Sequence, residues 1–405
     1  FSHELFKKIY KVTANGTLML GKDLVDMREI IGKRFWTTFE MIPSKEGKRT
    51  FYLKEATETE SWDDLLSTLP SGNDNRSIID DGTSQKLSKE EIVQLQESGK
   101  SGKEIVGSLI ENNKSFLDRT EYSQEKYLKK KEKKYARYLT ICKPNISSLH
   151  DVYFKLDHSK IVNLRMDTLA QLLSYSDVQS AGLYILYDSG SQGLLAAAML
   201  NRIGANTEGH LINLHPGNVP QTTLIQAMNF PTEQLDRLVN INIYSFLRLY
   251  HQGETIIKNN SISNEQSTNN CLTELKRKLD ESNDCEFTEV VPLKKPKWFL
   301  NTQRAVEFVQ NTKARGLVIV AKEHPLNIVT ALLSFLGPSR PFIIYHIYRE
   351  PLQETYMLLK QRQNVINLRL FSNFLRSYQI LPDRTHPDIL TSDTGGYLLT
   401  GYLVQ

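Results

Sequence analysis

Apolar runs and helical periods alternate over the second half of the chain. Short apolar runs are each followed by a polar turn and, in most cases, by residues with helical spacing. Strands with their following loops are predicted at 183–187, 210–218, 238–246, 316–325, 341–348, 365–371 and 396–404, and helices at 194–200, 326–336 and 351–362. This alternation predicts an open, mostly parallel sheet. No helical period separates the last two strands, so we expect an antiparallel hairpin there.

The N-terminal part, residues 1–87, has the shorter spacing of β structure. Asn15–Gly16 stands between two short runs and predicts a hairpin. The run Phe35–Phe39 predicts a further strand. The polar stretch Lys45–Asn75 is expected to form a long loop. These features together predict a small, barrel-like β domain.

Helical periods and connecting strands fill residues 88–164. Ser88 with Glu91 and Ser101 with Glu104 both match capping boxes, each followed by apolar residues at helical spacing. A third helix is predicted from near Thr120, and a strand follows at 136–144. We therefore predict a helical segment that joins the β domain to the rest of the chain.

Residues 165–405 are predicted to form a Rossmann-like domain. Asp167 is expected to cap its first helix. Residues 253–297 are polar, poor in aromatic side chains and rich in Ser, Asn and Glu. This composition predicts a poorly ordered insertion with at most one helix, near 272–279.

Composition narrows the class of protein. Hydrophobic residues make up 40% and charged residues 24% of the 405 residues, as in a soluble globular protein of more than one domain. No apolar run approaches the length of a membrane span. Cys142, Cys271 and Cys285 are widely spaced, which argues against a disulfide framework and a zinc site. A reducing compartment, cytosol or nucleus, follows from this use of cysteine.

The net charge of +4 is modest, but basic residues are concentrated in one stretch. Residues 126–137 hold six lysines and one arginine against the single acid Glu132. These cations are candidates for phosphate contacts with RNA: Lys126, Lys129, Lys130, Lys131, Lys133, Lys134 and Arg137. Tyrosines at 122, 127, 135 and 138 lie among them and are expected mostly to pack. A solvated helix face or a trafficking signal is the alternative interpretation.

A candidate cofactor loop follows the strand at 183–187. Its sequence DSGSQG places Asp188 and Gly190 where a nucleotide or S-adenosylmethionine loop requires them. Gln192 stands where a second glycine belongs, and Leu194 stands where a third would be. Asn213 is expected at the end of the next strand, where such a site requires an acid for the ribose. The loop is therefore interpreted as degenerate.

Catalytic groups are harder to find. Glu323 and His324 follow the fourth strand, where an acid–base pair is conceivable, although neighbouring loop residues match that description by chance. No Ser-His-Asp set, phosphate-binding loop or metal-ligand spacing rises above background, so no catalytic or metal residue is assigned. Arg376, Arg384 and His386 fall in the loop between the last two strands. Arg376 and Arg384 are further candidates for RNA contact, and salt bridges at the surface are the alternative interpretation.

Several motifs, in order along the chain, carry a resemblance to a known family. They are Asn73–Arg76, Asp80–Leu87, Lys126–Tyr135, Arg165–Gln171, Pro338–Phe342, Val365–Leu370, Leu381–Pro387 and Gly395–Leu399. With these motifs the chain resembles the non-catalytic, tRNA-binding subunits of eukaryotic tRNA (adenine-58) N1-methyltransferases. The N-terminal stretch and residues 253–297 match in character alone.

The resemblance implies an N-terminal β domain and a Rossmann-like methyltransferase domain that has lost its cofactor site. It implies no cofactor on this chain and S-adenosylmethionine on a catalytic partner, in a complex of two plus two subunits with tRNA across both. A nuclear location is expected. Two alternatives stay open: an active S-adenosylmethionine-dependent RNA methyltransferase with an unusual loop, and an RNA-binding scaffold, for instance in translation initiation.

Overall fold

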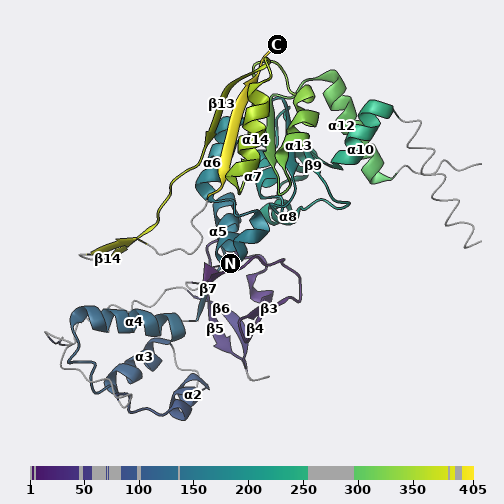
Figure 1. Cartoon of the computed structure of the whole chain (residues 1–405). Helices are drawn as coiled ribbons and strands as arrows, with labels where there is room; N and C mark the ends of the chain where they lie inside the picture. The colour runs from purple at the N-terminus through teal and green to yellow at the C-terminus, as the bar shows by residue number, and fades with distance from the viewer. Residues whose placement is uncertain are drawn as a thin grey trace, which may run out of the picture. The chain divides into compact units, whose positions relative to one another are not determined.

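A computed structural model describes residues 2–3, 6–44, 49–56, 70, 72, 84–97, 102–135, 137–253, 296–381, 384–387 and 395–405 (Figure 1). The chain divides into two units, residues 1–144 and residues 145–405. Both predicted fold classes are present, a strand-rich N-terminal unit and a Rossmann-like C-terminal unit.

The first unit contains a sheet with the strand order β2-β1-β7-β5-β6-β4-β3. β4 and β6 pair in parallel, and the other neighbours pair antiparallel. The strands are β1 (Ser2–His3), β2 (Phe6–Lys7), β3 (Thr17–Leu20), β4 (Asp23–Asp26), β5 (Thr38–Pro43), β6 (Thr50–Glu55) and β7 (Tyr138–Thr140), and a 3-10 helix η1 spans Arg28–Ile30. Alternate residues such as Phe39, Phe51 and Leu53 point into one apolar core, as the two-residue period of a strand requires.

The prediction of a hairpin at Asn15–Gly16 was wrong, because the hairpin forms at the next turn along the chain. The N–H of Gly16 donates to the carbonyl of Thr13 and closes a turn, but residues 9–13 form no strand. The hairpin instead joins β3 to β4 through Gly21 and Lys22. Gly21 has φ +63°, which a two-residue turn between twisted strands favours and which glycine adopts without steric cost.

Two further predictions in this unit need correction. β5 begins at Thr38, so Phe35 and Trp36 lie in the turn before the strand. The stretch Lys45–Asn75 contains β6, because apolar residues at alternate positions within Thr50–Glu55 fit one face of the sheet despite the polar surroundings. The remainder of that stretch, apart from residues 49–56, 70 and 72, lies outside the described residues.

Three helices follow, namely α2 (Lys89–Glu97), α3 (Gly102–Glu111) and α4 (Glu121–Tyr135). The predicted capping box at Ser88 is confirmed: Glu91 N–H donates to Ser88 Oγ at 3.2 Å, and Ser88 N–H donates to Glu91 Oε2 at 2.7 Å. Ser101 lies outside the described residues. The apolar faces of α3 and α4 meet in a core that includes Val106, Phe116 and Leu128.

After α4 the chain returns to the first sheet. β7 pairs with β5, with Thr140 opposite Thr38, so the helices are inserted between two strands of one sheet. The observed division at residue 144 therefore differs from the predicted boundaries at 87 and 164. The second unit begins with α5 (Ile146–Asp157), whose first turn is closed by a capping box between Asn145 and Ser148.

The second unit is a sheet with helices on both faces, in the strand order β10-β9-β8-β11-β12-β16-β13. Its strands are β8 (Leu183–Asp188), β9 (His210–His215), β10 (Leu238–Asn242), β11 (Gly316–Val320), β12 (Arg340–His346), β13 (Val365–Phe371) and β16 (Tyr397–Leu403). β16 runs antiparallel to both of its neighbours, which confirms the predicted final hairpin.

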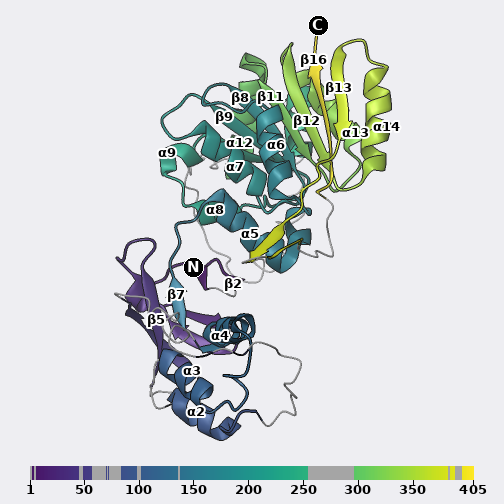
Figure 2. The same cartoon turned by 90° about the vertical axis from the view of Figure 1, so that its left-hand side faces the viewer.

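The helices of this unit follow the predicted alternation in part. Within the run 238–246, predicted as a strand with its loop, a helix begins at Ile243, because the Asn242 side chain accepts the N–H groups of Tyr244 and Ser245 and caps it. The helix at Lys297–Asn311 was not predicted. Beyond α5 the helices are η2 (His158–Ile161), α6 (Met166–Tyr175), α7 (Leu194–Ile203), α8 (Thr223–Met228), α9 (Thr232–Leu235), α10 (Ile243–Gln252), α12 (Lys297–Asn311), α13 (Pro325–Leu332), η3 (Leu333–Phe335) and α14 (Arg349–Lys360). The side of β8 that carries Leu183, Ile185 and Tyr187 packs with α10, α12, α13 and α14. α6 and α7 lie beside each other on the opposite face (Figure 2).

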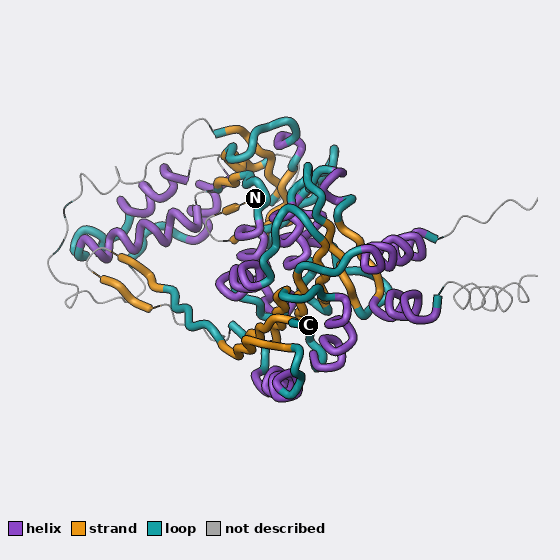
Figure 3. The backbone as a smooth tube through the Cα atoms, turned by 90° about the horizontal axis from the view of Figure 1, so that it is seen from above, coloured by secondary structure: helices purple, strands orange, loops and turns teal. Residues whose placement is uncertain are grey.

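A two-stranded ribbon interrupts the final hairpin. It consists of β14 (Tyr378–Leu381) and β15 (Arg384–Pro387), which pair antiparallel. The ribbon continues from β13 and runs away from the sheet (Figure 3). The predicted insertion at 253–297 and its helix near 272–279 fall almost wholly outside the described residues, which resume at residue 296.

Candidate functional site

The candidate cofactor loop follows β8 and is closed by its own hydrogen bonds. Asp188 is buried, and its Oδ1 accepts from the N–H groups of Gly190, at 3.0 Å, and Ser191, at 2.8 Å. The Ser191 hydroxyl donates to Oδ2 of the same carboxylate. Burial raises the pKa of Asp188, against the opposing effect of these donors. Both carboxylate oxygens of Asp188 therefore bind groups of the loop itself.

Lys322, from the segment after β11, lies against Gly190. A Cβ built on Gly190 would come within 2.2 Å of Lys322 Cε and 2.6 Å of Lys322 Nζ. The N–H of Lys322 also donates to Ser189 Oγ at 2.8 Å, which fixes this segment on the loop. The glycine thus gives room to a lysine side chain of the same protein.

The segment after β9 contacts the candidate cofactor loop through Gln221 and Thr223. The N–H of Gln192 donates to Gln221 Oε1 at 3.1 Å, and Thr223 Oγ1 donates to Gln192 Oε1 at 3.2 Å. A Cβ on Gly193 would lie 2.7 Å from the backbone oxygen of Gln221. Gln192 and Gly193 have φ of 58° and 76°, so the chain turns sharply into α7. An anion bound at a helix N-terminus would use the backbone N–H groups there. Here the Gln192 N–H donates to Gln221, the Leu194 N–H donates to the Ser191 carbonyl at 3.1 Å, and the Leu195 N–H lies 3.5 Å from Ser191 Oγ.

Two of the expected defects in this loop have a different basis. Leu194 is fully buried at the start of α7, so its side chain belongs to the core and adds no bulk beside the loop. Asn213 lies inside β9, where its Nδ2 donates to Asn240 Oδ1 at 2.8 Å on the neighbouring strand. His215 holds the carboxyl end of β9, and its Nδ1 lies 2.7 Å from the Gly217 carbonyl. An imidazole therefore stands where the ribose-binding acid was expected.

Sequence reasoning did not identify Gln221 or Lys322. Both lie on loops far from Gly190 in the sequence, and neither matches a motif spacing. Because β8 lies between β9 and β11 in the sheet, the loops after β9 and β11 flank the loop after β8. A residue spacing cannot predict such a meeting, because it depends on the sheet order.

Glu323 and His324 do not form an acid–base pair. Glu323 Oε1 accepts from the Tyr187 hydroxyl at 2.9 Å. His324 caps α13 by accepting the Leu326 N–H at its Nδ1, and its Nε2 lies 3.0 Å from Glu354 Oε2. The two side chains therefore have separate structural partners.

The basic run lies on α4, and five of its lysines share one face. Positions 126, 129, 130, 133 and 134 repeat with the three- and four-residue spacing of a helix face. Lys126, Lys129, Lys130 and Lys134 are exposed. Lys129 forms an exposed ion pair with Glu125 at 2.5 Å, a contact that contributes little in water. This set is called the lysine face of α4.

Lys131 and Arg137 depart from the predicted arrangement. Lys131 is half-buried, with its Nζ 5.1 Å from the centre of the Tyr127 ring, and burial lowers its pKa. Arg137 precedes β7, and its guanidinium lies 4.5 Å from the centre of the Phe51 ring. Burial lowers the pKa of Arg137 as well. Both cations pack against aromatic rings of the first unit. Among the exposed lysines, Lys134 also has its Nζ 5.1 Å from the centre of an aromatic ring, that of Tyr135.

The tyrosines of the basic run mostly pack, as predicted. Tyr135 is buried, and Tyr127 packs edge-on against Phe116 with ring centres 5.3 Å apart. Tyr138 is partly buried at the start of β7, whereas Tyr122 is exposed.

The two further arginine candidates lie in another part of the chain. Arg376 is exposed in the segment between β13 and β14, and Arg384 begins β15. Both arginines belong to the second unit, and the lysine face of α4 belongs to the first.

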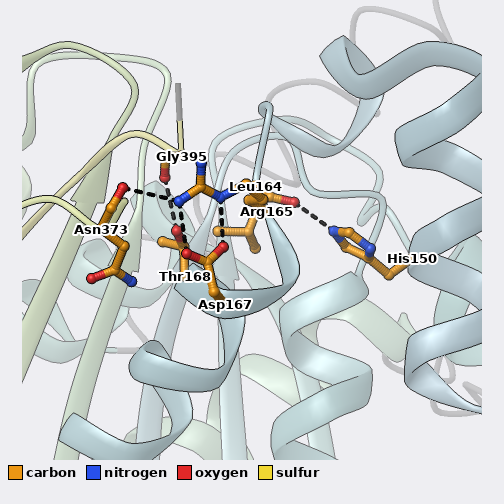
Figure 4. A network of polar contacts seen from close by, with 7 residues as sticks. All are labelled: His150, Leu164, Arg165, Asp167, Thr168, Asn373 and Gly395. Atoms are coloured by element: carbon orange, nitrogen blue, oxygen red, sulfur yellow. Dashed lines mark hydrogen bonds and ion pairs between the residues drawn. The ribbon is translucent and has the colours of Figure 1, made fainter. Parts of the chain in front are cut away.

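An ion pair between buried Arg165 and partly buried Asp167 lies at the base of the ribbon (Figure 4). Arg165 donates to both carboxylate oxygens of Asp167, at 2.6 Å from Nε and 2.7 Å from Nη2, and its Nη2 donates to the carbonyl of Asn373 at 2.9 Å. Thr168 Oγ1 donates to the carbonyl of Gly395 at 2.9 Å. Asp167 is therefore not the N-cap predicted from the sequence: α6 begins at Met166, and Arg165 precedes it. The motif instead ties the two chain ends of the 372–396 excursion to α6.

The described residues contain no helix long and apolar enough to cross a membrane. Within the same residues, no three His, Cys, Asp or Glu side chains are grouped so that they could hold a metal ion.

A Rossmann-like sheet whose antiparallel strand lies next to the edge strand, with an Asp-x-Gly loop after its first strand, defines the methyltransferase fold class. The chain belongs to the Gcd10p family, whose model matches residues 2–276. The resemblance predicted from the sequence motifs is thereby confirmed.

Named relatives agree with this family. The chain is 36% identical over 375 residues to the Mus musculus tRNA (adenine(58)-N(1))-methyltransferase non-catalytic subunit TRM6, covering 83% of this chain and 75% of that protein. It is 30% identical over 404 residues to the Dictyostelium discoideum protein of the same name, covering 97% and 75%. A solved tRNA (m1A58) methyltransferase, TrmI from Aquifex aeolicus, has a TM-score of 0.40 at 10% identity, covering 92% of this chain and all of that one.

Proposed function

We propose that this chain is a non-catalytic subunit of a tRNA (adenine-58) N1-methyltransferase. It binds tRNA and supports a catalytic partner that holds S-adenosylmethionine and methylates the adenine. The relatives' names support this assignment. The observation that carries it is the closed loop: Asp188 is bound by its own loop, Lys322 covers Gly190, and Gln221 accepts the N–H of Gln192.

The lysine face of α4 supplies the tRNA contact in this proposal. Exposed lysines on one helix face suit backbone phosphates, whose recognition is electrostatic and independent of sequence. Arg376, and Arg384 at the start of β15, are secondary candidates in the second unit. Lys131 and Arg137 act through packing, so they position the lysine face and are not expected to contribute most of its affinity.

Two copies of this chain with two catalytic subunits form the proposed complex, and the nucleus is its proposed location. The ribbon supports a partner contact because it and the segment before it expose large apolar side chains: Phe374 is 84% and Ile380 is 80% exposed. Exposed apolar residues on one projecting element are typical of a surface that another protein covers. A catalytic subunit is the partner that the relatives' names imply.

The test compares this chain alone, the catalytic subunit alone and the purified complex. Calorimetry with S-adenosylhomocysteine should give binding to the catalytic subunit and to the complex but none to this chain. Methyl transfer from labelled S-adenosylmethionine to a tRNA transcript should require the complex and should disappear when adenine 58 is replaced by guanine. Light scattering gives the subunit stoichiometry.

The two alternatives predict other outcomes. Micromolar cofactor binding by this chain alone would show an active methyltransferase. RNA binding without any copurifying methyltransferase, and without methyl transfer by the mixed subunits, would show a scaffold with a different role. Either result would overturn the proposal.

A further inference from the structure

The turn that leads into β5 exposes two large aromatic rings. Residues 32–37 form this segment, called here the aromatic turn. Phe35 is 53% exposed, and Trp36 is 64% exposed. The next core residue along the chain is Phe39 in β5, which is fully buried. Two neighbouring rings in solvent forgo the stabilisation that burial of so much apolar surface would bring.

The backbone of the aromatic turn is held in a conformation that disfavours a large side chain. Trp36 has φ 73°, in the left-handed region that glycine and asparagine adopt most readily. Its N–H donates to the carbonyl of Ile141 at 2.6 Å, and the N–H of Ile141 donates to the carbonyl of Thr37 at 3.1 Å. Thr37 Oγ1 donates to the carbonyl of Arg34 at 2.8 Å. The neighbouring segment thus fixes the turn, and burial of the indole ring does not account for its strain.

Basic residues lie close to the rings in the chain. Residues 30–39 contain Lys33 and Arg34, with Glu29 and Glu40 directly outside this range. Lys33 is paired with Glu55 at 2.5 Å, whereas Arg34 is exposed on the turn. Lys143, exposed as well, comes two residues after Ile141, which holds Trp36 in place. Aromatic rings beside cations suit unpaired nucleotides, because the rings stack on bases and the cations meet phosphates.

We propose that the aromatic turn is an RNA-binding site in which Trp36 and Phe35 stack on unpaired bases. This inference rests on the proposed function, in which the chain binds tRNA, and it adds a contact of another physical kind. The lysine face of α4 attracts phosphates over a distance, whereas the aromatic turn recognises bases that are not stacked in a helix. The lysine face of α4 and the aromatic turn both belong to the first unit. Along the chain, α4 is followed by β7, and β7 is followed directly by Ile141, which binds the aromatic turn.

Trp36→Asn is the informative variant. Asparagine tolerates the left-handed backbone, so thermal stability should be equal to that of the wild type or higher. Loss of a stacked base should weaken binding of a tRNA transcript about fivefold or more. The dependence of affinity on salt should keep its slope, because stacking releases no counterions. Trp36→Tyr should keep most of the affinity. Met19→Thr is the matched control, since Met19 is also an exposed apolar residue of this sheet, and it should leave RNA binding unchanged.

Fluorescence supplies an independent measurement. The chain has three tryptophans, so Trp62→Phe with Trp298→Phe leaves Trp36 as the reporter. Titration of the complex with tRNA should quench this signal, taken as the difference from a complex that also carries Trp36→Phe, and titration with a fully base-paired RNA duplex should quench it less. Equal quenching by the duplex, or no quenching at saturating tRNA, would overturn the proposal.

The two proposals fail in distinguishable ways. If the wild-type complex does not bind tRNA, the proposed function fails. If it binds tRNA, loses affinity on substitution of the lysine face, and keeps full affinity as Trp36→Asn, only the role of the aromatic turn fails. If Trp36→Asn instead reduces copurification with the catalytic subunit while tRNA affinity stays unchanged, the aromatic turn is a protein contact and the proposal is overturned.

Discussion

The N–H of Gln192 donates to the side-chain oxygen of Gln221, 3.1 Å away. Gln192 stands beside the N-terminus of α7, where free N–H groups would otherwise attract an anionic ligand. The acceptor comes from the loop after β9, so the protein supplies the partner that a cofactor supplies elsewhere. Asp188 is used in a similar way, since both of its carboxylate oxygens accept hydrogen bonds from the loop itself. These polar groups of the loop after β8 therefore have partners within the protein.

Asp188→Ala should therefore destabilise this chain without changing the cofactor affinity of the complex. The substitution leaves two buried N–H groups and the Ser191 hydroxyl without their acceptor, which costs about 1–3 kcal/mol. Urea unfolding of the chain should give this decrease, while the KM for S-adenosylmethionine in the complex stays at its wild-type value. A raised KM together with unchanged stability would show that the loop still meets a cofactor.

Arg165→Lys should cost far more than the same change at a surface site. The Arg165 side chain is 9% exposed, binds both oxygens of Asp167 and reaches Asn373, a geometry that lysine cannot reproduce. We expect a decrease of about 1–3 kcal/mol in unfolding free energy, because a lysine can supply at most one of the two hydrogen bonds to the partly buried Asp167 carboxylate and leaves the Asn373 carbonyl without this donor. Arg28→Lys is the matched control: Arg28 also binds an aspartate two residues away, Asp26, but at the surface. That variant should be destabilised by at most about 0.5 kcal/mol, and equal effects would contradict the prediction.

His150 should make stability depend on pH in the weakly acidic range. Its Nε2 lies 2.8 Å from the carbonyl of Leu164, its Nδ1 is buried with no partner among the described residues, and burial lowers its pKa. Below about pH 6.5 the unfolded chain takes up a proton that the folded protein does not. As the pH is lowered below this value, the free energy of unfolding should therefore decrease by up to about 1.4 kcal/mol per pH unit, until the pH reaches the lowered pKa of His150 in the folded protein.

His150→Gln provides the comparison, because its side-chain amide can donate the same hydrogen bond without titrating. Urea unfolding from about pH 7.5 to about pH 5.5 should give a flatter curve for the variant than for the wild type. His210 and His215, whose pKa values are also lowered by burial, are present in both proteins and cancel in the difference. Parallel curves would show that His150 does not couple folding to protonation.

The sequence predicted those parts of the fold that local periodicity determines. The apolar runs that became β8, β11 and β12 were recognisable because strands buried on both faces are apolar throughout. β6 was missed because its alternation is short and lies within a polar stretch. The closing contacts of Lys322 and Gln221 could not be predicted, since they depend on which loops the sheet order brings together. The sequence placed Gln192 where a glycine was expected, but it did not show that Gln192 binds Gln221 and Thr223.

Exposed apolar residues of the ribbon and of the segment before it can be changed to test assembly without disturbing the folding of the chain. Phe374→Ser with Ile380→Ser should leave the melting temperature of the isolated chain unchanged, because both side chains are largely in solvent. If a catalytic subunit covers them, removal of each apolar side chain should weaken association by about 1–3 kcal/mol. Light scattering and copurification measure the effect. Val219→Ser is the control, since Val219 is an exposed apolar residue far from the ribbon in sequence. Assembly that is equally strong in all variants would exclude the ribbon from the interface.

The lysine face of α4 gives the most direct test of tRNA binding. Changing Lys129, Lys130, Lys133 and Lys134 to Glu should weaken tRNA binding and flatten the plot of log affinity against log salt. The slope should decrease by about 0.7–0.9 for each phosphate that the variant no longer neutralises. Cofactor affinity and subunit assembly should survive. Lys131 and Arg137 stay unchanged in this variant because their packing on Tyr127 and Phe51 would confound binding with stability.

An equal change of charge elsewhere separates local contact from net charge. The control variant changes four exposed lysines of the second unit to Glu, namely Lys155, Lys160, Lys313 and Lys360. Both variants alter the total charge identically, so a general electrostatic effect would lower affinity in both. We expect the salt slope to fall only when the lysine face is changed, measured by tRNA affinity across a salt series with the complex verified by light scattering. An unchanged slope in an intact complex would make α4 a solvated helix and would move the tRNA contact to the segment that carries Arg376 and Arg384.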